Sequence, residues 1–246
     1  MKGLILAAGQ GSRLRPLTDS LPKTLLPVTD EMTILDAALS NLSVSGVERI
    51  AIITGFASDK IESIVPALEG RHGVSLELIF NDKGQTWNNA YSLWLGAHWM
   101  DEDTIVINSD TLHPPSVETA LIDTAAHEPD GLFIAVDTVK QLGEEEMKLT
   151  FTDHMHVRRI HKGINPAIAA GEYIGVTLLK EPSVADVMTS LRATWSRDTD
   201  LYYEDGYQDY IDRGERVIAV PIGDLPWVEV DSHDDLARAR DIACLY

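Results

Sequence analysis

The chain has 246 residues, with 44% hydrophobic and 24% charged side chains, so collagen-like, coiled-coil and disordered classes are excluded. Its 39 acidic and 20 basic side chains give a net charge of −19, which argues against nucleic acid and anionic membrane surfaces as partners. A single cysteine, Cys244, excludes a disulfide framework, and no apolar run reaches the roughly 18 residues of a membrane span. The first apolar run, residues 3–8, is too short for a signal peptide, so we expect a cytoplasmic protein.

In the first half of the chain, short apolar runs alternate with longer stretches whose apolar residues recur at helical spacing. This pattern predicts strands at 3–8, 49–54, 74–80, 104–108 and 132–139, and helices at 34–42, 61–68, 88–100 and 117–126. Strands that alternate with helices indicate βαβ units. We therefore expect a mostly parallel sheet with helices on both faces.

After Gly143 the pattern changes. It predicts a hairpin of strands 147–152 and 156–160, a strand at 172–179, a helix at 184–195, a helix ending before Gly214, a strand at 217–220 and a last helix at 234–243. No repeat, linker or low-complexity tract divides the chain. We expect a single domain over residues 1–246 of the α/β class, a Rossmann-like three-layer sandwich whose mixed sheet carries a β-rich elaboration in its second half.

Residues 1–28 are basic in an otherwise acidic chain: they hold Lys2, Arg13, Arg15 and Lys23 against one acid, Asp19. The loop after the first strand contains two glycines, whose backbone N–H groups can approach an anion closely because no Cβ intervenes. Such loops lie at the carboxyl end of a parallel strand, where α/β sheets bind ligands. The basic side chains add fixed positive charge, so the segment indicates a phosphate site.

A dinucleotide-binding fingerprint is the first alternative for this loop. It would need a third glycine where Leu14 stands and an acid after the second strand, where Thr54 and Gly55 stand. Both requirements fail. The second alternative, a structural glycine turn with solvated basic residues, would account for Gly-x-Gly alone.

The longer string from Leu6 to Val28, LAAGQGSRLRPLTDSLPKTLLPV, resembles the signature of the sugar-1-phosphate nucleotidylyltransferase superfamily. The resemblance implies nucleotide binding along this string: the backbone near Leu6, Ala7 and Ala8 faces the base, and Gly9, Gly11, Ser12 and Arg13 grip the triphosphate. It further implies that Lys23 touches both the α-phosphate and the acceptor phosphate. Residues 1–140 would then mainly bind the nucleotide, and residues 141–246 mainly the acceptor.

Two acidic residues are the expected metal ligands. Asp110 ends a hydrophobic strand beside the phosphate loop, a suitable position for Mg²⁺, although a turn-forming Asp would look the same. The resemblance places a metal-binding Asp here and a second one at Asp231, in the segment WVEVDSHDDL, with Glu229 as a weaker candidate. Ser232 would also cap a helix, which is compatible with Asp231 as a ligand. Mg²⁺ is therefore the expected cofactor, and Arg13, Lys23 and Asp110 are the expected catalytic residues.

The reaction implied is attack of an acceptor phosphate oxygen on the α-phosphorus of a nucleotide, with pyrophosphate leaving. The string around Asn88 and Asn89 is similar to bacterial CTP:phosphocholine cytidylyltransferases and their relatives acting on aminoethylphosphonate. Asn side chains offer the donors and acceptors that cytosine requires. One of the two is expected to cap a helix, which leaves the other free to contact the base of CTP.

Four residues are expected to bind the acceptor: Lys148, Lys162, Glu172 and Tyr173. The resemblance suggests this because the segments EEEMKL, RIHK and GEYIG parallel the acceptor side of the superfamily, although a Lys at a strand end is often only solvated. His161 stands where many sugar enzymes carry Glu. Aromatic residues near the site, with Glu204 and Asp205, would suit a cationic acceptor, and residues 195–208 are interpreted as a lid.

Three functions stay open at this point. The first is a cytidylyltransferase for phosphocholine or a small phosphonate, and the second a nucleotidylyltransferase for a sugar or polyol phosphate. The third, a non-catalytic nucleotide-binding regulatory subunit, is disfavoured because Arg13, Lys23, Asp110 and Asp231 are all present. The sequence leaves the oligomeric state open, with a homodimer as one option.

Overall fold

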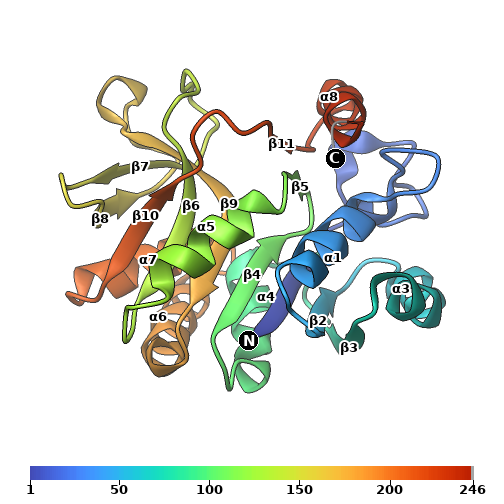
Figure 1. The fold of residues 1–246 in the computed structure, drawn as a ribbon, viewed down its shortest axis with the longest axis horizontal. Helices are drawn as coiled ribbons and strands as arrows, with labels where there is room; N and C mark the ends of the chain where they lie inside the picture. Colours follow the sequence, from blue (N-terminus) through green and yellow to red (C-terminus); the bar gives the residue numbers. More distant parts are fainter. Residues whose placement is uncertain (245–246) are drawn as a thin grey trace.

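One mixed sheet forms the centre of the computed structural model, which describes residues 1–244 (Figure 1). Along the sheet the strands follow the order β10-β6-β9-β4-β1-β2-β3, and only β9 of these runs antiparallel to its neighbours. The strands on this path are β1 (Lys2–Ala7), β2 (Arg49–Thr54), β3 (Ser75–Phe80), β4 (Thr104–Asn108), β6 (Leu132–Asp137), β9 (Gly171–Leu179) and β10 (Val217–Pro221). The expected mixed, mostly parallel sheet is confirmed.

The central strand β1 is apolar along its length because both of its faces are covered. It pairs in parallel with β2 and β4, so that Ile5 lies between Ile52 and Ile107. All six of its residues are buried, whereas the edge strand β3 alternates between half-buried and exposed positions. The chain therefore emerges from the middle of the sheet at Ala7, where the glycine loop begins.

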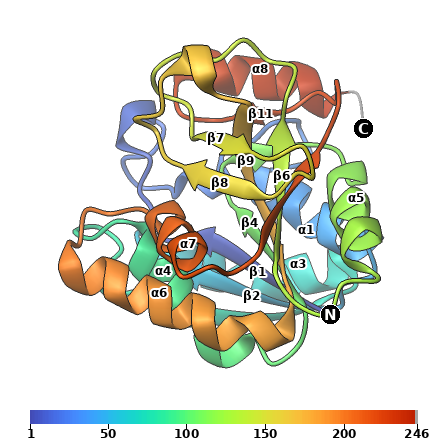
Figure 2. The same cartoon turned by 90° about the vertical axis from the view of Figure 1, so that its left-hand side faces the viewer.

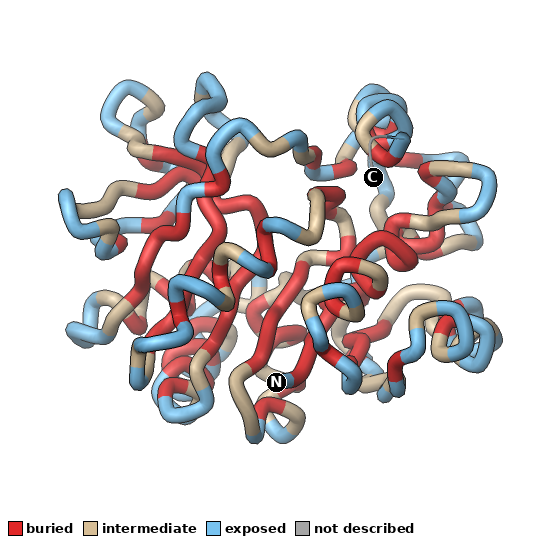
Figure 3. The backbone as a smooth tube through the Cα atoms, viewed as in Figure 1, coloured by how far each residue is buried: buried red, intermediate tan, exposed pale blue. Residues whose placement is uncertain are grey.

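Helices cover both faces of the sheet, as Figure 2 shows. On one face lie α1 (Ile34–Val44), α3 (Val65–His72) and α5 (Ser116–Ala125), whose apolar residues share a core cluster with the strands. On the other lie α4 (Asn89–Leu95), α6 (Val184–Arg197) and α7 (Tyr203–Asp212), with a second cluster. The tube coloured by burial has its strands buried and the outer turns of its helices exposed, as a three-layer α/β fold requires (Figure 3).

Two predicted helices differ from the observed ones. The helix expected at 61–68 is two helices, α2 (Ser58–Glu62) and α3, and Pro66 lies in the first turn of the second. The helix expected at 88–100 changes after α4 into the 3₁₀ turn η3 (Gly96–Trp99). A Cβ on Gly96 would lie 2.7 Å from Leu4 Cδ2, so glycine lets this turn approach β1 closely.

The stretch interpreted as an aperiodic lid holds the start of a regular helix instead. Residues 203–208 are the first part of α7, which packs against α6 and β8 (Val157–Ile160). Asp205 accepts a hydrogen bond from the backbone N–H of Tyr202 at 2.8 Å, which fixes the start of this helix. The aromatic composition hid the helical period because three tyrosines of α7 are buried core residues: Tyr203, Tyr207 and Tyr210.

The β-rich elaboration is the expected hairpin, β7 (Lys148–Phe151) with β8, which joins the beginning of β9. At the carboxyl edge of the sheet, two short strands were not predicted: β5 (Thr111–Leu112) and β11 (Val228–Glu229), which pair antiparallel beside α8 (His233–Ala243) (Figure 1). The backbone N–H of Val230 donates to the carbonyl of Asp110 at 2.8 Å. This pairing brings the end of the chain to the end of β4.

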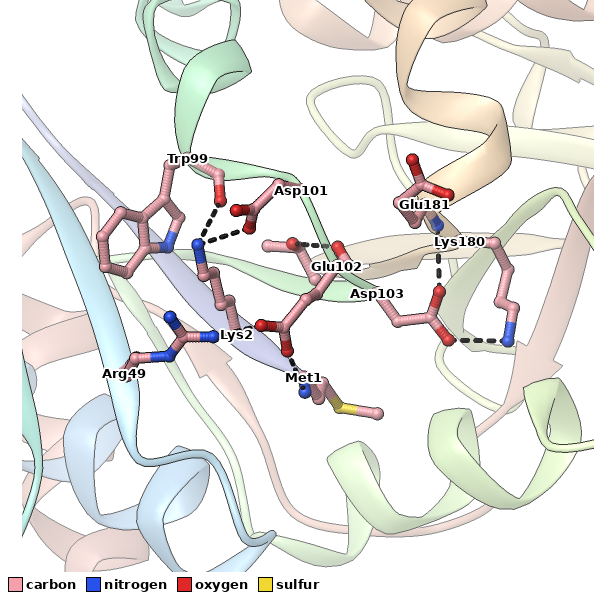
Figure 4. Close-up of polar contacts among 10 residues, drawn as sticks. Met1, Lys2, Arg49, Trp99, Asp101, Glu102, Asp103, Lys180 and Glu181 are labelled. Atoms are coloured by element: carbon pink, nitrogen blue, oxygen red, sulfur yellow. Dashed lines mark hydrogen bonds and ion pairs between the residues drawn. The ribbon is translucent and has the colours of Figure 1, made fainter.

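Charged residues join the strands at the opposite edge of the sheet (Figure 4). Lys2 Nζ donates to Asp101 and to the carbonyl of Trp99 and lies 4.4 Å from that ring's centroid. Lys180 Nζ lies 2.6 Å from Asp103 Oδ2. These contacts stabilise the amino-terminal edge, far from the glycine loop. Every helix within residues 1–244 is too short or too polar to span a lipid bilayer.

Candidate active site

The loop after β1 is shaped by one glycine with a left-handed backbone. Gly11 has φ 72°, and a Cβ there would lie 2.7 Å from Lys23 Cβ, so any other residue would be strained and would collide with that lysine. Thr18 Oγ1 donates to the Gly11 carbonyl at 2.8 Å and holds the turn. A Cβ on Gly9 would meet nothing within 4 Å. The backbone of the loop is thus open toward the cleft at Gly9 and packed on Lys23 at Gly11.

Lys23 links the two expected metal ligands. Its Nζ lies 2.9 Å from Asp110 Oδ2 and 2.9 Å from Asp231 Oδ1, and Arg13 lies 3.1 Å from the other Asp231 oxygen. Burial alone would lower the pKa of Lys23, but the charges of the two aspartates raise it above its ordinary value. Burial tends to raise the pKa of Asp231, yet the ammonium of Lys23 holds it below its ordinary value. The lysine is therefore a permanent cation at this position.

Glu229 completes a group of three carboxylates. One oxygen each from Asp110, Glu229 and Asp231 lie within 4.8 Å of one another. Partial desolvation and the negative charges of Asp110 and Asp231 raise the pKa of Glu229, although its side chain remains exposed to solvent. Crowding of like charges without enough cations has an energetic cost, which a divalent cation would remove.

The donor set fits Mg²⁺, a hard cation that prefers carboxylate oxygens. Asp110 Oδ1 is buried and has no hydrogen-bond partner among the residues that the structure describes. A buried carboxylate oxygen without a partner is costly unless something outside the chain binds it. Asp110, Glu229 and Asp231 are the residues that could hold the metal.

A cleft of about 380 Å³ opens above these groups at the carboxyl edge of the sheet. Most of the residues expected at the site line it: Leu6, Ala8, Gly9, Gly11, Ser12, Arg13, Lys23, Asn88, Asn89, Asp110, Lys162, Tyr173 and Asp231. Segments far apart in the sequence therefore meet at a single cleft.

Three expected residues lie elsewhere. Ala7 is buried in β1. Lys148 is fully buried, and its ammonium donates to the carbonyls of Glu144 at 2.7 Å and Glu146 at 3.1 Å, so it holds its own loop in place of an acceptor phosphate. Glu172 lines a neighbouring cavity, where its carboxylate lies 2.9 Å from Lys140 Nζ.

Both asparagines line the cleft, but their oxygens are already used. Asn88 is the N-cap of α4, as expected for one of the pair: its Oδ1 accepts from the Asn89 backbone N–H at 2.8 Å. Asn89, expected to be free, accepts at its Oδ1 from the backbone N–H of Tyr203 at 2.9 Å. That bond fixes the orientation of the Asn89 amide and leaves its NH₂ group available to a ligand.

Sequence reasoning missed Asn108 and ranked Glu229 as a weaker candidate, although both line the cleft. Asn108 and Asp110 are two residues apart at the end of β4, and Glu229 and Asp231 are two apart at β11. Alternation along an extended chain puts Glu229 and Asp231 on one side, and this signal could have found Glu229. Asp110 lies in the turn after β4, so the same spacing does not place Asn108. Gly175, with φ 83°, makes room for Asn108: a Cβ there would lie 2.7 Å from Asn108 Nδ2.

Comparison with known proteins agrees with this geometry. The family model described as nucleotidyl transferase matches residues 2–243. A choline-phosphate cytidylyltransferase of Streptococcus pneumoniae is 39% identical over 95 residues, which are 39% of this chain and 38% of that protein. A CMP-5'-(3-aminopropyl)phosphonate synthase of Streptomyces rubellomurinus is 25% identical over 249 residues, covering 97% of this chain and 38% of that protein. These alignments therefore span less than two fifths of either relative.

Among solved structures, a CTP:phosphocholine cytidylyltransferase of Streptococcus pneumoniae superposes with a TM-score of 0.75. The sequences are 24% identical, and the match covers 98% of both chains. At this identity the likeness establishes the α/β fold.

Proposed function

The chain belongs to the nucleotidyl transferase family, and from this premise we propose that it transfers CMP from CTP to a small phosphate or phosphonate acceptor, such as phosphocholine or aminoethylphosphonate, with release of pyrophosphate. One observation carries the proposal: Lys23 Nζ lies 2.9 Å from both Asp110 and Asp231, next to the glycine loop. A fixed cation between two carboxylates, beside a glycine loop, suits a reaction between two anions.

In the proposed reaction an oxygen of the acceptor phosphate attacks the α-phosphorus of CTP. A new P–O bond forms, the bond to the β-phosphate oxygen breaks, and that oxygen leaves with pyrophosphate. The nucleophile is already anionic, so no general base is required. The site must hold two mutually repelling anions in line and neutralise the charge that develops, which Arg13 and Lys23 are placed to do.

Asp110, Glu229 and Asp231 would hold Mg²⁺. When bound, the metal supplies positive charge that neutralises phosphate oxygens. Within the chain, Lys23 is the main counter-charge to these acids and holds Asp110 and Asp231 close to the phosphate loop.

The preference for cytosine is supported by Asn89. Its oxygen is bonded to the backbone of Tyr203, so its amide presents donors to the cleft. Cytosine offers an acceptor at N3, where uracil carries an N–H, and a donor facing a donor is repulsive. One relative is named for choline phosphate and the other for an aminopropylphosphonate product. Both names support a small acceptor that carries an amine or ammonium group.

A sugar or polyol phosphate is the second candidate acceptor. It is favoured by Glu204, a buried carboxylate lining the cleft that could accept a hydrogen bond from a hydroxyl group. The two candidates share the transfer chemistry and differ only in the group at the far end of the acceptor.

The test is a pyrophosphate-release screen of four nucleoside triphosphates against phosphocholine, aminoethylphosphonate, hydroxyethylphosphonate and several sugar 1-phosphates with Mg²⁺. We expect CTP with a small amine acceptor to give the highest rate. Lys23→Met should abolish that rate, whereas the matched control Lys60→Met, at an exposed position on α2, should keep it. Equal use of UTP or GTP with every acceptor would refute the cytidylyltransferase proposal and favour the second candidate.

A further inference from the structure

Glu204 is a buried acid with an unused oxygen. It lies in the first turn of α7, is only 5% exposed and lines the cleft. Its Oε2 is buried without a hydrogen-bond partner among the residues that the structure describes. An isolated carboxylate inside a protein is costly unless a donor or a cation meets it.

The hydroxyl groups around Glu204 also bond to other acceptors. Tyr203 donates its hydroxyl to Asn108 Oδ1 at 3.0 Å and to the oxygen of Tyr173 at 3.1 Å, and the Tyr173 hydroxyl is 2.7 Å from Thr177 Oγ1. Burial raises the pKa of Glu204 to about 7, although a backbone N–H and the Tyr203 side chain, through hydrogen bonds to the carboxylate, partly oppose the rise.

Lys162 lines the same cleft and is one of the residues expected to bind the acceptor. Its Nζ is 4.9 Å from the centroid of the Tyr202 ring, the residue that precedes α7. A phosphate at Lys162 would thus place the rest of a short acceptor within reach of the first turn of α7. Glu204 lines the same cleft as Lys162, so an acceptor group that reaches its unpaired oxygen should carry both a positive charge and an N–H.

We propose that Glu204 receives the protonated primary amine of the acceptor and thereby selects primary ammonium acceptors over quaternary ammonium ones. This inference rests on the proposed CMP transfer and adds the identity of the far end of the acceptor. A primary ammonium supplies the charge and the hydrogen bond that Oε2 lacks, whereas a quaternary ammonium supplies only the charge and leaves the oxygen unpaired.

The aromatic residues of the cleft support the same choice. Quaternary ammonium groups are bound by open aromatic cages. Here the Tyr202 ring already faces Lys162, and Trp87 packs against Tyr91 and Trp195, with ring centroids 5.0 Å and 5.9 Å away. Tyr173 packs edge-on against Tyr203 in the core. Within residues 1–244, the rings that line the cleft are thus engaged with other side chains.

The experiment compares kcat/KM for acceptors of graded donor number: phosphoethanolamine, its N-methyl and N,N-dimethyl derivatives, and phosphocholine, each with CTP. We expect phosphoethanolamine to exceed phosphocholine by about 10- to 100-fold, with the largest single step at the loss of the last N–H. 2-Hydroxyethyl phosphate, a neutral donor, should be poorer than phosphoethanolamine.

Two variants identify the residue responsible. Glu204→Gln, which keeps the shape and removes the charge, should bring the ratio of phosphoethanolamine to phosphocholine to within about threefold. Asp205→Asn is the matched control, because that carboxylate caps α7 through Tyr202 N–H, and it should keep the wild-type ratio. An unchanged ratio in Glu204→Gln, a wild-type preference for phosphocholine, or a preference for 2-hydroxyethyl phosphate would overturn the inference.

Failure of the proposed function has a different result. If no acceptor in the series releases pyrophosphate, the transfer proposal fails. Calorimetric binding of phosphoethanolamine and phosphocholine to the wild type and to Glu204→Gln then decides the inference alone. Tighter binding of phosphoethanolamine that depends on Glu204 would support it, and equal binding by the two proteins would refute it.

Discussion

Replacing Asp110 by Asn removes one negative charge from the cleft and almost nothing else. The side chain keeps its shape at the end of β4, where Oδ2 accepts from Lys23 Nζ at 2.9 Å. Oδ1 has no partner to lose among the described residues. Lys23 also keeps Asp231, at the same distance. The change therefore tests the charge of Asp110 with little disturbance of packing.

The expected effect on activity is large, whereas the expected effect on stability is small. Two unit charges 2.9 Å apart attract by roughly 6 kcal/mol at an effective dielectric constant of about 20, before the cost of desolvation, so the site loses a strong local field. Loss of one preorganised electrostatic group costs about 10²- to 10⁴-fold in rate, or about 3–5 kcal/mol of transition-state stabilisation. The free energy of unfolding should change by less than about 1 kcal/mol, because the variant also relieves repulsion among three carboxylates.

The assay is pyrophosphate release at saturating CTP and acceptor over a Mg²⁺ titration, with urea unfolding of the same preparation. Asp59→Asn, an exposed acid on α2, is the matched control and should retain normal activity. Near-normal turnover of Asp110→Asn would show that this carboxylate does not act in the reaction. If Asp110→Asn loses enough stability to explain its loss of activity, the expectation that the substitution hardly disturbs packing would be refuted.

Three further outcomes are expected. Lys23→Ala should lower kcat and kcat/KM together in steady-state kinetics, because the repulsion between the acceptor and the α-phosphate is greatest in the transition state. An effect confined to the KM for CTP would contradict this prediction. Glu204→Gln should stabilise the unliganded protein by about 1–3 kcal/mol near pH 8 but not near pH 4.5. The pKa of Glu204 is raised to about 7, so its costly charged form is populated only as pH rises. Urea unfolding at both pH values measures the free energy of unfolding, and an equal increase at the two would refute the prediction. Asp36→Asn should destabilise the protein by about 1–3 kcal/mol near pH 7, because hydrogen bonds from His72, Thr33 and Arg71 hold the pKa of Asp36 below its ordinary value. The difference in stability between the wild type and the variant should shrink as pH falls below 3.8, the ordinary pKa of Asp. A difference in unfolding midpoint that stays constant with pH would show that the charge of Asp36 does not contribute.

The sequence by itself determined the local elements and the phosphate loop. The alternation of apolar runs with helical stretches predicted the α/β sheet, because burial on both faces makes parallel strands continuously apolar. The string from Leu6 to Val28 indicated the family, since its glycines, Arg13 and Lys23 are close together in the chain. Local chemistry of this kind needs no knowledge of distant contacts.

Boundaries that depend on neighbouring elements were less predictable. The helix at 88–100 changes to a 3₁₀ turn because Gly96 packs on Leu4 of β1. The first turns of α7 were taken for an irregular lid because their tyrosines are core residues shared with α6 and β9. In both cases the tertiary contact, and not the local propensity, decided the conformation.

Only the tertiary structure decided how the site is completed. Pairing of the two-residue strands β5 and β11 brings Asp231 and Glu229 to Asp110, across more than a hundred residues, and strands this short carry no periodic signal. The fold also assigned Lys148 to its own loop carbonyls and the Asn89 oxygen to Tyr203, because a buried polar group bonds to whichever partner packing places beside it. Among residues 1–244 it left one buried oxygen of Glu204 unpaired, which no pattern in the sequence could have revealed.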